Sequence, residues 1–222
     1  MRRSLRLYRG PDMRTNVYID GFNFYYGCVK DTPYKWLNFE ILCHLVFPNN
    51  QIQRIRYFTA RVRPPVNDPQ KPQRQATYLR ALQTIPNLTI HYGTFLSHVV
   101  KMPLAKPVPG GAHLVEVIKM EEKGSDVNLA TYLLMDGFQK DYEMAVVVSN
   151  DSDLMEPIKQ VREVLGLNVG VLNPQQDDKK TSWVLMHTAD FYRRIRTGVL
   201  KASLFPPTLT DANGTITKPA GW

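Results

Sequence analysis

The sequence predicts an α/β protein in which helices cover both faces of a central, mainly parallel sheet. Short apolar runs alternate with segments of helical periodicity along most of the chain, which is typical of strand–helix units. The stretch Ala145–Leu154 shows the pattern most clearly, because a β-branched run passes into small polar residues and then into a helical pattern. Its two carboxylates follow the strand, where open parallel sheets place their chemistry.

The elements of the first half follow from local signals. A first strand is expected over Asn16–Asp20, a turn over 21–23 and a helix over Phe24–Lys30. Asn38 is a good N-cap for a second helix, Phe39–Phe47. We then expect a strand in the later part of Ile52–Val62, an exposed basic loop over 61–69, a helix over Gln70–Thr84 and a strand over Leu88–Phe95.

The second half begins with an insertion. Residues 96–120 alternate around a turn rich in proline and glycine, which predicts a β-hairpin, and residues 121–126 are expected to form a loop. The remaining elements are expected to be helices over Asp126–Phe138, Leu154–Leu165 (with Gly166 as its C-cap) and Thr181–Thr188, and strands over Ala145–Val148 and Asn168–Leu172. Together these elements predict a three-layer α/β/α arrangement with an inserted hairpin.

Composition and charge narrow the class of protein. The chain has 222 residues, 43% of them hydrophobic and 22% charged, as in soluble globular proteins. No apolar run has membrane-spanning length, and no apolar segment follows the basic start, so we expect neither a membrane protein nor a signal peptide. Cys28 and Cys43 lack metal-ligand spacing and are expected to be free, buried thiols in a cytoplasmic protein.

The net charge of +8 favours an anionic partner, with nucleic acid first. Residues 1–12 hold four arginines and one aspartate, a net of +3, so the rest of the chain still carries +5. We expect residues 1–12 to be a disordered or upstream extension before Met13. The main domain is then expected over residues 13–200, followed by a C-terminal strap over residues 201–222, which are rich in proline, threonine and glycine.

Four aspartates stand at predicted strand ends or at a helix start: Asp20, Asp126, Asp151 and Asp153. Taken singly, each has a structural interpretation as a turn or capping residue, and Asp153 with Glu156 fits a capping box. Taken together at one sheet edge, they would repel each other unless a cation neutralised them. Oxygen ligands without His or Cys point to Mg²⁺ or Mn²⁺, which can hold water and phosphate together.

Other phosphate and hydrolase chemistries fit the motifs less well. There is no glycine-rich loop followed by Lys-Ser/Thr, and there is no Gly-x-Ser-x-Gly elbow. The first strand ends in Asp20-Gly21-Phe22, not in two aspartates one residue apart, which argues against an aspartyl-phosphate phosphatase.

Three blocks, Tyr18–Asn23, Lys123–Ala130 and Val148–Leu154, resemble the signature motifs of the NYN family of PIN-like ribonucleases. The resemblance runs from about residue 14 to residue 196. It implies a PIN-like fold, a Mg²⁺ or Mn²⁺ site and cleavage of RNA phosphodiester bonds. The four aspartates match the acidic positions of the family, and Asn23 matches the polar residue after the first; Ser149 and Asn150 are expected to support the site.

One position departs from the family pattern. Many members have a further aspartate on the Lys-Gly-x-Asp helix, where this chain has Tyr132. Asp136 cannot replace it, because it lies ten residues, or about 15 Å, along the helix from Asp126 and is turned off its face. Whether one or two metal ions bind is therefore open. The hairpin and tail resemble a bacterial subgroup of the family.

Basic and aromatic side chains near the acidic edge are candidates for the RNA track. They are Arg61, Arg63, Lys119, Lys123, Tyr25 and Tyr26. Two classes of function stay open: a Mg²⁺- or Mn²⁺-dependent endoribonuclease, and an RNA-binding regulatory module with weak or no cleavage. A structure-specific DNase is a third alternative. The RNA can be single-stranded or structured, and a homodimer is left open.

Overall fold

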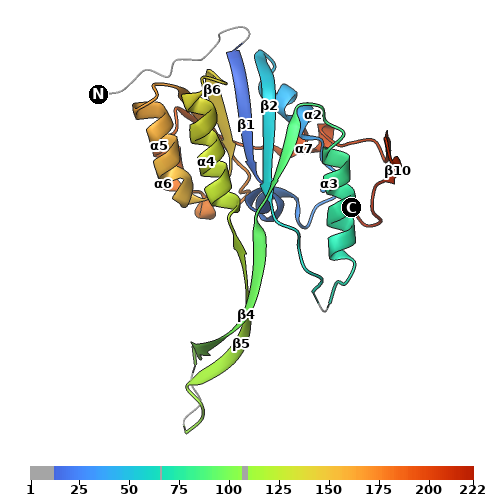
Figure 1. The fold of residues 1–222 in the computed structure, drawn as a ribbon, viewed down its shortest axis with the longest axis vertical. Helices are drawn as coiled ribbons and strands as arrows, with labels where there is room; N and C mark the ends of the chain where they lie inside the picture. The colour runs from blue at the N-terminus through green and yellow to red at the C-terminus, as the bar shows by residue number, and fades with distance from the viewer. Residues whose placement is uncertain (1–12, 66, 107–109) are drawn as a thin grey trace.

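The computed structural model describes residues 13–65, 67–106 and 110–222, so the expectation for residues 1–12 lies outside the described residues. The predicted fold class is confirmed: a six-stranded sheet with the order β3-β2-β1-β6-β7-β8 lies between two layers of helices (Figure 1). All five strand pairings in this sheet are parallel. The strands are β1 (Met13–Asp20), β2 (Asn50–Thr59), β3 (Leu88–Tyr92), β6 (Met144–Val148), β7 (Asn168–Asn173) and β8 (Phe191–Arg194).

The helices divide between the two faces of the sheet. One face carries α1 (Gly21–Phe24), which continues as a π-helical turn, η1 (Tyr25–Val29), together with α2 (Phe39–Val46), α3 (Lys71–Leu82) and α7 (Thr197–Ala202). The other face carries α4 (Ser125–Phe138), α5 (Met155–Glu163) and α6 (Trp183–Thr188). A 3₁₀ turn, η2 (Ser152–Leu154), precedes α5, and another, η3 (Asp178–Lys180), precedes α6.

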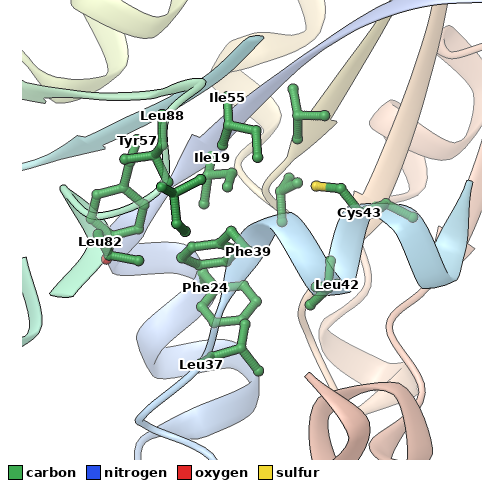
Figure 2. Close-up of a cluster of buried hydrophobic side chains, with 14 of the residues drawn as sticks. Ile19, Phe24, Leu37, Phe39, Leu42, Cys43, Ile55, Tyr57, Leu82 and Leu88 are labelled. Carbon is green, nitrogen blue, oxygen red and sulfur yellow. The ribbon is translucent and has the colours of Figure 1, made fainter. Parts of the chain in front are cut away.

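Alternation along β1 creates two hydrophobic cores. Val17 and Ile19 face the first core, and Tyr18 between them faces the second. In the first core, Ile19 and Ile55 of the sheet meet Phe24 and Phe39 of the helices (Figure 2). Full burial of each such side chain stabilises the fold by about 1.5–3 kcal/mol relative to exposure.

Some helix boundaries follow the expected signals, but α1 begins at Gly21, inside the turn expected over 21–23, because the side chain of Asp20 caps it. The side chain of Asn38 accepts hydrogen bonds from the backbone N–H groups of Glu40 and Ile41, as an N-cap does. Gly166, after α5, has a φ of 68°, the left-handed conformation expected of a residue that ends a helix.

The inserted hairpin is confirmed and forms a sheet of its own. Strands β4 (Thr94–Pro103) and β5 (Leu114–Lys123) pair antiparallel from Thr94 opposite Lys123 to Pro103 opposite Leu114. Figure 1 shows this arm projecting from the body, beyond the end of the sheet at which β1 and β2 finish. The arm therefore begins and ends at the carboxyl edge of the large sheet.

Two glycines form the root of the arm. A Cβ at Gly93 would lie 2.2 Å from Oε1 of Glu122 and 2.6 Å from the carbonyl oxygen of Lys123, so only glycine lets the two strands meet there. Gly124 has a φ of 97° and turns the end of β5 directly into α4. The loop expected over residues 121–126 is therefore wrong, because β5 continues to Lys123.

Some elements at the C-terminal end were not predicted. Strand β8 joins the sheet beside β7, although half of its four residues are exposed and its pattern is weak. Helix α7 and a small hairpin, β9 (Thr208–Asp211) with β10 (Gly214–Thr217), follow it. Phe205 and Ile216 of this tail are buried in the first core. None of the described helices is long and apolar enough to cross a membrane.

Candidate active site at the carboxyl edge

Asp20 is fixed at the centre of the edge. It is the last residue of β1 and is only 3% exposed. Its Oδ1 accepts a hydrogen bond from the backbone N–H of Asn23 (2.9 Å), and its Oδ2 accepts one from the hydroxyl of Ser149 (2.9 Å). Because Ser149 directly follows β6, this bond joins the ends of two neighbouring strands. Burial raises the pKa of the Asp20 carboxyl, and these hydrogen bonds oppose the rise.

Asp151 and Asp153 lie on the turn that leaves β6. The hydroxyl of Ser149 accepts a hydrogen bond from the N–H of Asp151 (3.0 Å), and Oδ1 of Asp151 accepts one from the N–H of Asp153 (3.0 Å). Asp151 is therefore the N-cap of η2. The capping box considered for Asp153 and Glu156 is not formed, because the cap falls on Asp151 instead.

Asn23 and Asn150 brace the same turn. Oδ1 of Asn23 accepts a hydrogen bond from the N–H of Asn150 (3.3 Å). The amide of Asn150 donates to the carbonyl oxygen of Lys180 (2.7 Å) and accepts from the N–H of Ser182 (2.8 Å). Ser149 and Asn23 thus hold Asp20, and Asn150 ties the turn to the loop before α6.

Asp126 faces the other carboxylates from the first turn of α4. Partial burial raises its pKa to about 7, and the charges of Asp20, Asp151, Glu122 and Asp153 add to the rise. The expected turn or capping role does not explain Asp126, because the N-cap of α4 is Gly124. The four predicted aspartates thus follow a strand that ends at this edge or begin a helix there, and the charges of the other three act on Asp126.

Glu122 is a fifth acidic residue at this edge that the sequence analysis missed. Its Oε1 accepts hydrogen bonds from the backbone N–H (3.1 Å) and the hydroxyl (2.8 Å) of Ser125. Two features of the sequence could have indicated it: Glu122 lies three residues before the start of α4, and Gly124 stands between them. The segment was expected to be a loop, so these features were not used.

Tyr132, at the position where many family members have an acid, belongs to an aromatic cluster. Its ring lies 4.1 Å from that of His91 and 6.0 Å from that of Phe58. The guanidinium of Arg56 lies over it, 4.4 Å from the ring centre. Asp136 pairs with Arg56 (2.7 Å) inside the protein, in agreement with the expectation that it cannot replace the missing acid.

Four of the six predicted RNA-binding residues gather near the root of the arm. Arg61 stacks on Tyr92 at the end of β3 (5.2 Å), and Arg63 donates to the carbonyl oxygen of Phe95 (3.4 Å). Lys119 and Lys123 lie on β5, where both form ion pairs with Glu121. These cations therefore stand on the arm and the loop that border the acidic edge.

Tyr25 and Tyr26 lie elsewhere. Their rings pack edge to face against each other (5.1 Å) and line a separate pocket to which none of the four aspartates contributes. Gly21 and Phe22, the two residues after Asp20, line the same pocket.

The donor chemistry of the edge fits a hard divalent cation. The candidate ligands are all carboxylate oxygens, which Mg²⁺ and Mn²⁺ prefer. Within residues 13–65, 67–106 and 110–222, no group of three or more His, Cys, Asp or Glu side chains is already gathered at metal-binding spacing. Mg²⁺ does not need such a group, because it often binds through one or two carboxylates and keeps several waters.

A parallel sheet with this strand order and an acidic carboxyl edge defines a PIN-like α/β protein. The NYN domain model matches residues 14–196, and the chain belongs to the NYN family. The family is nuclease-like and generally binds nucleic acid, and NYN and PIN-like nucleases usually use divalent metal ions.

A curated relative and a solved structure extend the comparison. The chain is 31% identical over 236 aligned residues to the 6-hydroxy-3-succinoylpyridine 3-monooxygenase HspA of Pseudomonas putida, and the match covers 95% of this chain and 75% of the relative. A crystal structure of a protein of unknown function from Vibrio parahaemolyticus aligns with a TM-score of 0.55 at 15% identity, covering 90% of this chain and 100% of that one. The second match supports the fold alone.

Proposed function

We propose that the protein is a Mg²⁺- or Mn²⁺-dependent endoribonuclease whose catalytic and metal-holding residues are Asp20, Asp126, Asp151 and Asp153. The observation that supports the proposal is the position of these residues at strand ends and at the start of α4 in a NYN fold, where burial and the charges of the other acids raise the pKa of Asp126. A divalent ion bound there would offset this repulsion, activate water and stabilise charge on the phosphate.

The chain's own residues supply position and proton control. Ser149 and Asn23 orient the Asp20 carboxylate through two hydrogen bonds, so little reorganisation is needed when a cation or substrate arrives. In the metal-free protein burial and the neighbouring acids raise the pKa of Asp126 to about 7; a bound cation would lower it, so that the carboxylate could hold the ion or its water.

The proposed substrate is RNA, single-stranded or structured, whose backbone lies against the root of the arm. Arg61, Arg63, Lys119 and Lys123 provide the positive charge there. Such contacts to phosphates give affinity without sequence preference. Tyr25 and Tyr26 are left out of this track because they line a different pocket.

The test is to incubate the purified protein with defined RNA and DNA oligonucleotides in Mn²⁺, Mg²⁺ or EDTA. We expect RNA cleavage that needs the metal, is abolished by Asp20→Asn and Asp153→Asn, and is kept by Glu163→Gln, an exposed acid at the end of α5. RNA affinity of the two aspartate variants should be unchanged or higher, because each removes a negative charge. Tight binding without cleavage would favour the regulatory-module alternative, and cleavage of DNA alone would favour the DNase.

A second candidate function comes from the curated relative. Identity of 31% across almost the whole chain is specific enough to test whether this protein shares the activity in the relative's name. The measurement is consumption of 6-hydroxy-3-succinoylpyridine in the presence of O₂ and a reductant. Turnover of this compound without RNA cleavage would replace the ribonuclease proposal.

A further inference from the structure

A pocket of about 290 Å³ lies on the side of the sheet that carries α1 and α3. It is bordered by α1 and η1, by α3 and by the last residues of the chain, and it begins at Gly21, the residue after Asp20. Gly21 and Phe22 line it directly after Asp20, and burial together with the charge of Asp20 raises the pKa of Tyr57 in its lining, so the pocket adjoins the acidic edge although none of the four aspartates lines it.

Aromatic side chains form its walls. Tyr25 and Tyr26 stand edge to face at 82°, so they offer two differently oriented ring surfaces. Trp222 reaches the pocket from the tail, where its ring lies 5.6 Å from that of Tyr78 and 6.4 Å from that of Trp36. Rings held in this way offer flat surfaces on which a planar ligand can stack.

One residue of the pocket lining, Tyr57, carries a hydroxyl that a ligand could use. Tyr57 comes from β2, is 6% exposed, and makes no side-chain hydrogen bond within the described residues. Its hydroxyl lies against Gly21, where an added Cβ would come within 2.7 Å of it. This hydroxyl can therefore bond a polar group of a ligand that enters the pocket.

The charged side chains of the lining favour an anion. Lys30, Lys35, Lys71 and Arg74 stand against Asp31 and Asp68. Arg74 is paired with Asp68, whereas the three lysines form no ion pair within the described residues. The amino group of Lys30 lies 5.6 Å from the ring centre of Tyr26, so positive charge stands beside the aromatic wall.

We propose that this pocket binds a planar aromatic ring that carries an anionic group. The ring would stack on Tyr25, Tyr26 or Trp222, the acid group would meet the lysines, and the Tyr57 hydroxyl would bond a polar atom of the ligand. The volume is at the small end of ligand sites, which suits one small molecule and not an RNA strand. A free mononucleotide and a monocyclic heteroaromatic acid share this chemistry.

Binding is measured by calorimetry in EDTA with uridine 5′-monophosphate and pyridine-3-carboxylate, each beside its neutral counterpart, uridine or pyridine-3-carboxamide. We expect at least one of the acids to bind at least about tenfold more tightly than its neutral counterpart. Preference for uridine 5′-monophosphate would identify the ligand as a mononucleotide, and preference for pyridine-3-carboxylate would identify it as a heteroaromatic acid. If both acids bind no better than their neutral counterparts, the proposal is overturned.

Variants then place the ligand. Tyr26→Ala and Lys35→Ala remove accessible side chains of the lining and should each weaken binding about tenfold or more, while Lys159→Ala, an exposed lysine on the opposite face, should not. Tyr57→Phe removes only the hydroxyl and should weaken binding less. Unchanged affinity in folded Tyr26→Ala and Lys35→Ala would show that the ligand binds elsewhere.

This binding does not depend on the proposed ribonuclease activity. Asp153→Asn should bind the aromatic anion like the wild type. Ligand binding without RNA cleavage would leave the pocket standing and remove the ribonuclease, and cleavage without ligand binding would do the opposite.

Discussion

Helix α4 carries an aspartate near each end, and the two have opposite environments. Asp136, 2% exposed, accepts two hydrogen bonds from Arg56 (2.7 and 2.8 Å) and one from the hydroxyl of Tyr18 (2.7 Å). Asp126 faces other carboxylates, and its pKa is raised to about 7. The carboxylate of Asp136 therefore has its hydrogen bonds and its charge satisfied, whereas the carboxylate of Asp126 is repelled by its neighbours.

The difference separates residues that hold the fold from residues that do chemistry. A buried carboxylate with a guanidinium and a hydroxyl has its charge compensated by the protein itself. Carboxylates that face each other lack such compensation and cost stability unless a ligand supplies the missing charge. On this basis, we propose that the acidic edge is a site for a cation and an anionic substrate, whereas the Arg56–Asp136 pair holds the fold together.

The largest expected effect on stability is that of Asp136→Asn. It leaves the guanidinium of Arg56 buried without a counter-charge, which typically costs about 3–5 kcal/mol. Denaturant unfolding measures this cost. Glu143→Gln is the control, because its ion pair with Arg14 is exposed and should contribute less than about 1 kcal/mol. Equal losses in the two variants would show that the buried pair has no special role.

Metal binding should stabilise the acidic edge by a smaller amount. At 100 times the dissociation constant, Mn²⁺ would add about 2.7 kcal/mol to the free energy of unfolding. The melting temperature of the wild type should therefore rise in Mn²⁺, and that of Asp151→Asn should rise much less. If the two proteins shift equally, the ion binds somewhere else.

Asp126→Asn should stabilise the metal-free protein at pH 8. With a folded-state pKa of about 7 against an ordinary value of 3.8, the folded chain binds the proton more tightly, so stability falls as pH rises between these values. After discounting for solvent screening, the gain in the variant is about 1–2 kcal/mol at pH 8. It should vanish near pH 3, and the pH dependence of unfolding checks this. A variant that is less stable than the wild type at pH 8 would contradict the account.

Lys123→Ala should have the smallest effect. Loss of one phosphate contact should weaken RNA binding less than tenfold and lower the slope of log affinity against log salt by about 0.7 for a single strand. Titrations at several salt concentrations measure both, with Lys159→Ala as the control. An unchanged slope would place the RNA away from the root of the arm.

The sequence was sufficient for the features that rest on local patterns. The apolar run that ends at Val148, the polar turn after it and the helix start at Asp126 predicted the strand ends, and parallel strands then place their carboxylates on one edge. Asn38 and Gly166 marked helix ends for the same local reason.

Features that depend on tertiary contacts could not be predicted. Glu122 reaches the site because β5 extends to Lys123 and Gly93 leaves space for its side chain. This contact joins two strands, so no local sequence pattern predicts it. Strand β8 is short and half exposed, and it is fixed by its neighbour β7. Tyr25 and Tyr26 line a pocket that α3 and the tail complete, and only the packing of these distant segments creates it.

The most direct test of the account measures rate and stability on one variant. Single-turnover RNA cleavage in Mn²⁺ and denaturant unfolding in EDTA, both at pH 8, are compared for wild type and Asp126→Asn. We predict that the cleavage rate falls by about two orders of magnitude or more, while the metal-free protein becomes as stable as the wild type or more so. Cleavage at the wild-type rate, or a loss of rate accompanied by a matching loss of stability, would contradict the claim that the acidic edge is kept for catalysis.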